Sequence, residues 1–180
     1  MAITINGSTG ITSSEIADGT IVNADINSSA AIAQSKTASL VGGDLPTGSV
    51  LQVVQATHAS QVATTATSWT NMGLSASITP NSSSNKILVI LDYIGAVTSD
   101  NHLYIQILRD STSIISNPSA FFAQSAGISG GGLTLKKLDS PNTDSSVTYS
   151  GQFHTRDSGE QVLVQYGNSP STITLMEIAG

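Results

Sequence analysis

The segment KILVILDYI, residues 86–94, carries apolar side chains on both faces of one predicted strand, because side chains alternate across a strand. One face holds Ile87, Val89, Leu91 and Tyr93, and the other holds Leu88, Ile90 and Ile94. A strand that is apolar on both faces is covered on both sides. We expect the domain core to cover one face and a neighbouring subunit the other. The alternative is an edge strand covered by a loop of its own chain.

The C-terminal segment STITLMEIAG, residues 171–180, repeats this pattern. Ile173 and Leu175 share one face, whereas Met176 and Ile178 share the other. Two doubly apolar strands in one small domain predict an oligomer. The predicted subunit interface consists of Leu88, Ile90, Ile94, Met176 and Ile178.

Short apolar or alternating runs surround these two segments, and stretches rich in Ser, Asn, Asp, Gly or Pro separate them. The predicted strands are residues 50–55, 76–79, 86–94, 102–108, 132–138, 147–154, 161–166 and 172–178. No stretch shows a sustained helical stripe with caps. Residues 46–180 are therefore predicted to form an all-β domain, a jelly-roll-like β-sandwich.

Residues 1–45 follow a different pattern, in which isolated isoleucines stand in polar sequence. The spacing is five residues and then six, at Ile11, Ile16, Ile21, Ile26 and Ile32. This step matches neither a helix nor a strand, and one such chain buries too little apolar surface to offset its ordering entropy. We predict a short N-terminal fibrous stalk in which three copies bury each isoleucine layer on a common axis. A flexible, low-complexity linker is the alternative.

The composition excludes several classes of protein. Charged residues make up 10% of the 180 residues and the net charge is −6, while 29 Ser and 20 Thr supply the polar surface. Six Lys and Arg against twelve Asp and Glu leave no basic surface for nucleic acid. The longest mainly apolar run, residues 87–94, is far shorter than the roughly 20 residues of a spanning helix. The chain has no cysteine, and no secretory signal follows Met1.

The motifs that could carry catalysis lack their structural context. Gly127-Ile128-Ser129-Gly130-Gly131 matches G-x-S-x-G, but a strand pattern follows it where a helix is required. His58, His102 and His154 are scattered and have no zinc-site spacing. The closest carboxylate pair, Asp157 and Glu160, lies in a predicted tight turn. We therefore predict no catalytic residue, no metal, no cofactor and no enzymatic activity.

The remaining candidates are recognition surfaces. Trp69, the single tryptophan, is suited to binding a sugar face, but its apolar neighbours Met72 and Leu74 favour a place in the core or an interface. Two polar loops are predicted to contact a receptor. The receptor-contact residues are Asp100, Asn101 and His102 in the first loop, and Asn142 and Asp144 in the second.

Several segments resemble tail-fibre and capsid-fibre proteins of marine bacteriophages, including phages of cyanobacteria. The resemblance lies in MAITINGSTGIT (residues 1–12), GTIVNADINSSAAIAQSK (19–36), PTGSVLQVVQATHASQ (46–61), SWTNMGLSASITPNSSSNKILVILDYIG (68–95), LYIQILRDSTSI (103–114) and ITLMEI (173–178). Together these segments cover most of the chain.

The resemblance implies a homotrimeric structural protein of the virion, made in the host cytoplasm during assembly. Its N-terminal segment would attach to other virion proteins, and its C-terminal domain would project toward a host surface polysaccharide. The chain is short for a long tail fibre, so a capsid decoration or head-fibre protein is the alternative. A polysaccharide depolymerase is a further alternative and needs a pair of carboxylates in a cleft.

Overall fold

A computed structural model describes residues 45–98, 100–123 and 127–180, together with Ile26 and Ser29. By its internal contacts the chain divides into two compact units, Met1–Leu40 and Val41–Gly180. Of the five isoleucines predicted for the stalk axis, only Ile26 is described, and its side chain is exposed. The other four lie outside the described residues. Within the described part, no helix is long and apolar enough to cross a membrane.

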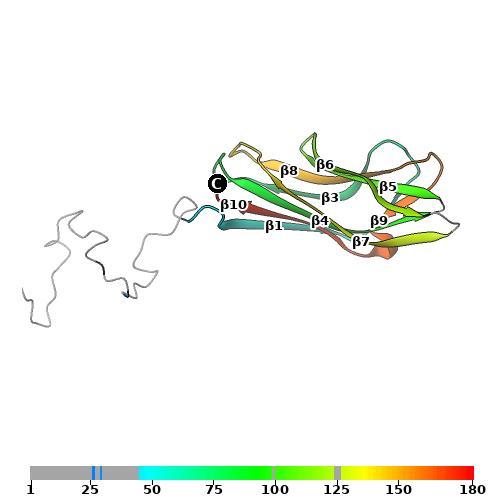
Figure 1. Cartoon of the computed structure of the whole chain (residues 1–180), viewed down its shortest axis with the longest axis horizontal. Helices are drawn as coiled ribbons and strands as arrows, with labels where there is room; N and C mark the ends of the chain where they lie inside the picture. Colours follow the sequence, from blue (N-terminus) through cyan, green and yellow to red (C-terminus); the bar gives the residue numbers. More distant parts are fainter. Residues whose placement is uncertain (1–25, 27–28, 30–44, 99, 124–126) are drawn as a thin grey trace, which may run out of the picture. The chain divides into compact units, whose positions relative to one another are not determined.

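The unit Val41–Gly180 consists of two layers of antiparallel strands (Figure 1). Sheet A contains β1 (Val50–His58), β2 (Val62–Thr64), β4 (Lys86–Thr98), β7 (Ile128–Asp139), β9 (Val162–Val164) and β10 (Ser171–Ile178). Sheet B contains β3 (Thr70–Ile78), β5 (Asn101–Arg109), β6 (Thr112–Ala123) and β8 (Val147–Thr155). A single-turn 3-10 helix, η5 (Tyr166–Asn168), connects β9 to β10.

The strand pairing is that of one long hairpin folded into two layers. β5 pairs with β6, β4 with β7, β3 with β8 and β1 with β10, all antiparallel. The resulting orders are β1-β10-β4-β7 in sheet A and β3-β8-β5-β6 in sheet B. β9 pairs with β4 beyond the end of β10, and β2 pairs with β9. This is a jelly roll, so the predicted all-β sandwich is confirmed.

The core lies between the sheets and follows the alternation of the sequence. On β4, Ile87, Val89, Leu91 and Tyr93 are buried and face sheet B, as predicted. From sheet B, the core receives Met72, Leu74, Ile78, Leu103, Ile105, Ile107, Val147, Tyr149 and Phe153. The apolar side chains of one sheet face therefore pack against those of the other, as in a sandwich.

The predicted strand pattern needs several corrections. The short strand β2 was not predicted, and β3 begins at Thr70, whereas the predicted strand began at residue 76. β6 was not predicted, because Pro118 in its middle is typical of a turn. β6 is the edge strand of sheet B, where a missing backbone N–H is tolerated, and its pairing with β5 is irregular between Leu103 and Ile105. The strand predicted over residues 161–166 is shorter, since Gln165 has a positive φ of 52° and ends it.

The hydroxyl of Tyr93 is buried in this core without a hydrogen-bond partner among the described residues. A buried hydroxyl that makes no hydrogen bond costs about 1–3 kcal/mol. We therefore expect Tyr93→Phe to leave the free energy of unfolding unchanged at neutral pH, or to raise it by about 1 kcal/mol. Urea unfolding measures this change, and a clear loss of stability would show that the hydroxyl has a partner.

The same substitution has a second effect at alkaline pH. Burial raises the pKa of Tyr93 well above its ordinary value of 10.0, so the folded state keeps a proton that the unfolded state loses. Stability from this residue is present below pH 10.0 and falls as the pH rises above it. We expect Tyr93→Phe to make that fall less steep.

Candidate functional site

Trp69 lies on the outer face of sheet B, which corrects the expectation that it packs in the core. Met72 and Leu74 point inward and are fully buried, whereas Trp69 has the opposite parity and is 38% exposed. It directly precedes β3, whose Thr70 pairs with Phe153 on β8. Trp69 therefore stands opposite His154 on the solvent side of the sheet.

Three further rings continue from Trp69 across sheet B. The Trp69 and His154 rings are perpendicular, with centroids 4.4 Å apart. His154 pairs in register with Tyr104 on β5, and these two rings are stacked at 4.6 Å with an angle of 4° between their planes. His102, two residues from Tyr104, stacks on it at 6.3 Å. We call Trp69, His154, Tyr104 and His102 the aromatic row.

Neutral polar side chains adjoin the aromatic row. The Gln106 amide on β5 donates a hydrogen bond of 2.8 Å to Gln152 Oε1 on β8. Gln152 pairs in register with Asn71 on β3, whose side chain is exposed. His154 Nδ1 lies 2.7 Å from the Thr155 carbonyl oxygen. Since a carbonyl only accepts, Nδ1 is the donor in this contact.

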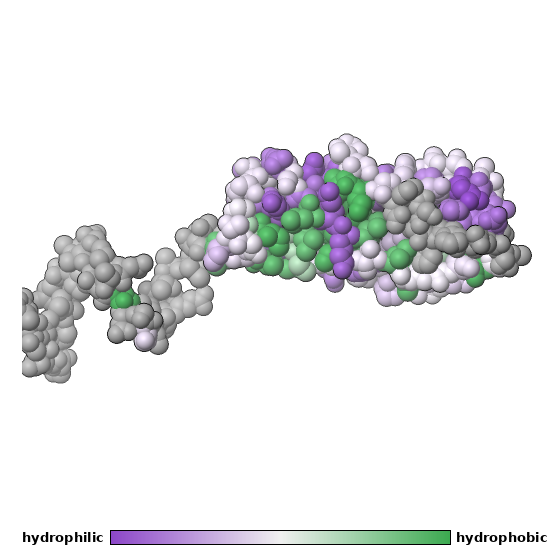
Figure 2. Space-filling view, viewed as in Figure 1, coloured by the Kyte–Doolittle hydropathy of each residue, from purple (hydrophilic) through white to green (hydrophobic). Residues whose placement is uncertain are grey.

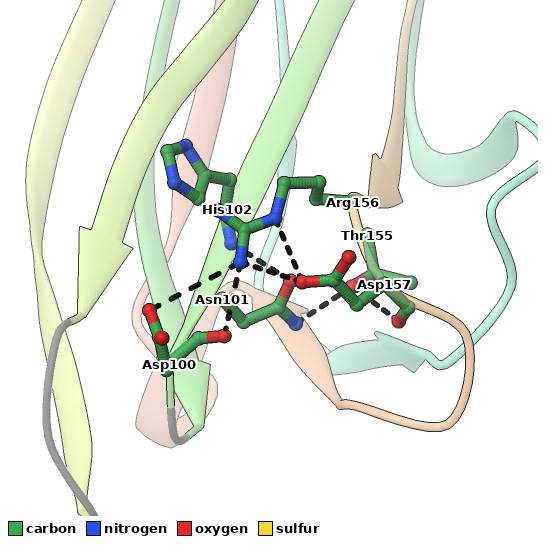
Figure 3. Close-up of polar contacts among 6 residues, drawn as sticks. All are labelled: Asp100, Asn101, His102, Thr155, Arg156 and Asp157. Carbon is green, nitrogen blue, oxygen red and sulfur yellow. Dashed lines mark hydrogen bonds and ion pairs between the residues drawn. The ribbon is translucent and has the colours of Figure 1, made fainter.

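A polar network closes the end of the domain next to the aromatic row (Figure 3). Arg156 Nη2 lies 2.6 Å from Asp157 Oδ2 and 4.0 Å from Asp100 Oδ1. Asn101 Nδ2 donates to Thr155 Oγ1 at 2.6 Å, and both residues are buried. The network ties the segment before β5 to the loop after β8.

The predicted receptor-contact residues do not form one site. Asn101 is buried and its side-chain amide is hydrogen-bonded to Thr155, so the prediction that it contacts a receptor is wrong. Asp100 is exposed and His102 is partly exposed. Asn142 and Asp144 are exposed as well, but they precede β8, whereas the first loop lies beside its other end. A strand rises about 3.4 Å per residue, so the length of β8 separates the two loops.

The residues predicted for a subunit interface lie together on the outer face of sheet A. Val53, Met176, Leu88 and Leu138 pair in succession across β1, β10, β4 and β7 and form one apolar row. Val53 is 56% exposed and Leu138 is 49% exposed. Ile90, Ile94 and Ile178 on the same face are partly exposed. We call these seven residues the apolar face, on which the exposed charged residues Lys86, Asp92 and Lys136 also lie.

The apolar face lies toward the end of the domain where residue 45 enters. There the Gly48 amide donates to the Ala179 carbonyl at 2.9 Å, and the Ala179 amide donates to Ser49. On the side of the molecule seen in Figure 2, hydrophobic residues gather over the half that carries the C-terminal end, interrupted by a hydrophilic band. Such patches on a soluble domain are typical of interaction surfaces.

The candidate catalytic motifs have other structural roles. Ser129 lies within β7 and pairs with Val97, so the G-x-S-x-G match is part of a strand. The Asp157 carboxylate accepts a hydrogen bond from Arg156 Nε at 2.7 Å and forms an ion pair with Arg156 Nη2. Asp139 accepts from Arg109 Nη1 at 2.7 Å and from the Tyr149 hydroxyl at 2.8 Å. Within the described part, no three His, Asp or Glu residues are grouped to hold a metal ion.

Comparisons with known proteins find only distant structural likeness. No protein-family model matches the chain, and a search of curated proteins finds no match. A structure of the Gx strain of infectious bursal disease virus is 15% identical over 72% of this chain, with a TM-score of 0.38. A structure of the Gt strain is 12% identical over 72%, also with a TM-score of 0.38. The matches span 37% and 38% of those chains, and at this distance they assign neither a family nor a function.

Proposed function

We propose that the chain is a non-enzymatic structural protein of a bacteriophage particle, a homotrimeric fibre. In this proposal the N-terminal segment attaches to other virion proteins, and the jelly roll projects toward the host surface. Support comes from the sequence resemblance to phage fibres and from the apolar face of sheet A. The virion is accordingly the proposed location of the protein.

The apolar row is the observation that carries the proposal. Val53, Met176, Leu88 and Leu138 cross four neighbouring strands without a charged residue between them, and the two end residues are about half exposed. A second copy is the occupant we propose, because residues 1–45, with their isolated isoleucines, also require partner chains to bury apolar side chains.

Leu88→Asp on the full chain tests this assembly. Leu88 lies between Met176 and Leu138 in the row, so the substitution would bury one carboxylate per subunit in an apolar interface, at a cost of several kcal/mol for each. We expect wild-type protein to sediment as a trimer and the variant to shift toward monomer. Analytical ultracentrifugation measures both.

Ser75→Asp is the matched control. Ser75 is exposed on the outer face of sheet B, so this charge should leave the trimer unchanged. A monomeric wild type, or a trimer insensitive to Leu88→Asp, would overturn the proposed assembly. Mass spectrometry of purified particles tests the virion role separately, since the protein must be present among their structural components.

A further inference from the structure

The exposed aromatic row requires an explanation other than core packing. Aromatic residues make up only 4% of the chain, and Tyr93, Tyr149 and Phe153 are almost fully buried between the sheets. The single tryptophan is instead exposed, beside rings from two further strands. Strands lie about 4.8 Å apart, so a row that spans three of them is about 10 Å long.

The surroundings of the row match a neutral ligand with many hydroxyl groups. Asn71 and Gln152 carry amide groups on the same face of sheet B, while the buried Gln106 amide donates to Gln152, and His154 adds a polar imidazole whose Nδ1 contacts the Thr155 carbonyl. The nearby charges of Arg156, Asp157 and Asp100 are directed at one another (Figure 3). A ligand that depended on ion pairs would find these charges already engaged.

We propose that the aromatic row of sheet B binds a neutral saccharide. The Tyr104 and His154 rings are stacked on each other, so the 38% exposed Trp69 is the ring on which a pyranose would stack. One face of a pyranose presents C–H groups, which carry a small positive charge and are attracted to the electron-rich face of an aromatic ring. The hydroxyl groups at the sugar's edge then hydrogen-bond with neighbouring amides and imidazoles. Binding sites of this kind combine an aromatic surface with a few well-placed polar groups.

The saccharide is favoured over other occupants on charge and position. The net charge of −6 opposes nucleic acid and other polyanions. The row belongs to sheet B, whereas the proposed trimer contact belongs to sheet A, so assembly leaves the row accessible. The proposal rests on the proposed function for its biological setting, since a host-facing appendage requires a surface ligand.

The single tryptophan provides a direct measurement. Full-length protein is titrated with neutral oligosaccharides of glucose, galactose, mannose, fucose and N-acetylglucosamine, and with sialylated and sulfated oligosaccharides as charged counterparts. We expect a saturable change in Trp69 emission with at least one neutral oligosaccharide, at an affinity little affected by salt. Saturation-transfer NMR should show contact through the sugar C–H groups.

Variants locate the binding to the row. We expect Tyr104→Ala to weaken the affinity at least tenfold in the tryptophan titration, and Trp69→Ala to abolish binding measured by calorimetry. Tyr166→Ala is the matched control, because Tyr166 is a partly exposed aromatic residue in η5, outside the row. It should bind like wild type. Circular dichroism checks that each variant is folded.

Three results would overturn the proposal. The first is the absence of binding by every neutral oligosaccharide in the panel. The second is an equal loss of affinity in Tyr166→Ala and Tyr104→Ala. The third is quenching of Trp69 fluorescence by acrylamide in the monomeric Leu88→Asp variant but not in the wild-type trimer. That result would show that a second copy covers the aromatic row. Ultracentrifugation separates a failure of trimer assembly from a failure of sugar binding.

Discussion

Glu177→Ala is expected to lower the free energy of unfolding by about 1–3 kcal/mol. Glu177 on β10 is fully buried, and its carboxylate accepts hydrogen bonds from three amide groups in two other segments. The Gln52 amide donates to Oε2 at 2.6 Å, while the Asn81 backbone N–H and the Asn85 amide each donate to Oε1 at 2.6 Å. The substitution would leave the buried Asn85 amide and the partly buried Asn81 N–H without this acceptor, while Gln52 would keep its hydrogen bond to the Thr79 carbonyl.

The expected loss is large because the network joins separate parts of the fold. Gln52 belongs to β1, while Asn81 and Asn85 belong to the connection between β3 and β4. Asn85 also accepts a hydrogen bond from the Gly180 backbone N–H at 3.1 Å. One carboxylate therefore holds together the end of the domain where residue 45 enters and β10 finishes.

Urea unfolding at a fixed protein concentration measures the change, because oligomer stability depends on concentration. Thr172→Ala is a suitable control, since Thr172 is a partly exposed residue of the same strand on the opposite face. We expect the control to change stability by less than about 1 kcal/mol. A loss for Glu177→Ala no larger than the control's would contradict the role given to this network.

Gly151→Ala is expected to lower the free energy of unfolding by about 1–3 kcal/mol through overpacking. Gly151 is buried in the middle of β8, directly against Met72 of β3. A Cβ atom there would lie 1.9 Å from Met72 Sδ and 2.8 Å from Met72 Cγ. Because Met72 is fully buried, it cannot move aside without displacing the core around it.

A double-mutant cycle tests this explanation. Met72→Ala alone should destabilise by about 2–5 kcal/mol through the cavity it leaves. In the double variant the new methyl group occupies part of that cavity, so the combined loss should be smaller than the sum of the two. Gly132→Ala is the control, because its Cβ would come no closer than 4.0 Å to the Tyr93 carbonyl oxygen. Simple additivity in the cycle would refute the proposed clash.

The side-chain alternation of single strands was enough to predict the sandwich and much of its core. The two faces of β4 were assigned correctly, with Ile87 and Leu91 buried and Leu88 and Ile90 turned outward. Alternation is a local property of the chain, so it could be read without knowing which strands pair. The edge strand β6 was missed because its proline is also typical of turns.

The apolar face and the aromatic row could not be predicted in full, because both depend on strand pairings that side-chain alternation does not reveal. Leu88 and Met176 were recognised as outward-facing, but Val53 and Leu138 join their row only through the register of β1 and β7. Trp69 is a different case. The alternation of Met72, Leu74 and Ile78 already places odd-numbered residues of β3 on the outer face, so its exposure was within reach of the sequence.

The contacts within the aromatic row could not be predicted from the sequence. Tyr104 and His154 stack because β5 and β8 are neighbours in register, although they lie far apart in the chain. The burial of Asn101 has the same origin, since its partner Thr155 ends β8. Strand register is fixed by how whole faces fit together in the core, and a single sequence does not specify which strands become neighbours.

The folded hairpin also imposes an order on how the domain can form. Among the four nested pairs, β5 and β6 have the shortest connection, and each further pair encloses a longer stretch of chain, until Val50 of β1 meets Ile178 of β10. Closing longer loops costs more entropy before any contact compensates it. On the ribosome, β1 must wait for nearly the whole domain to be synthesised. The apolar face is assembled from these late pairings, so the surface proposed for trimer contact exists only once the domain has nearly finished folding.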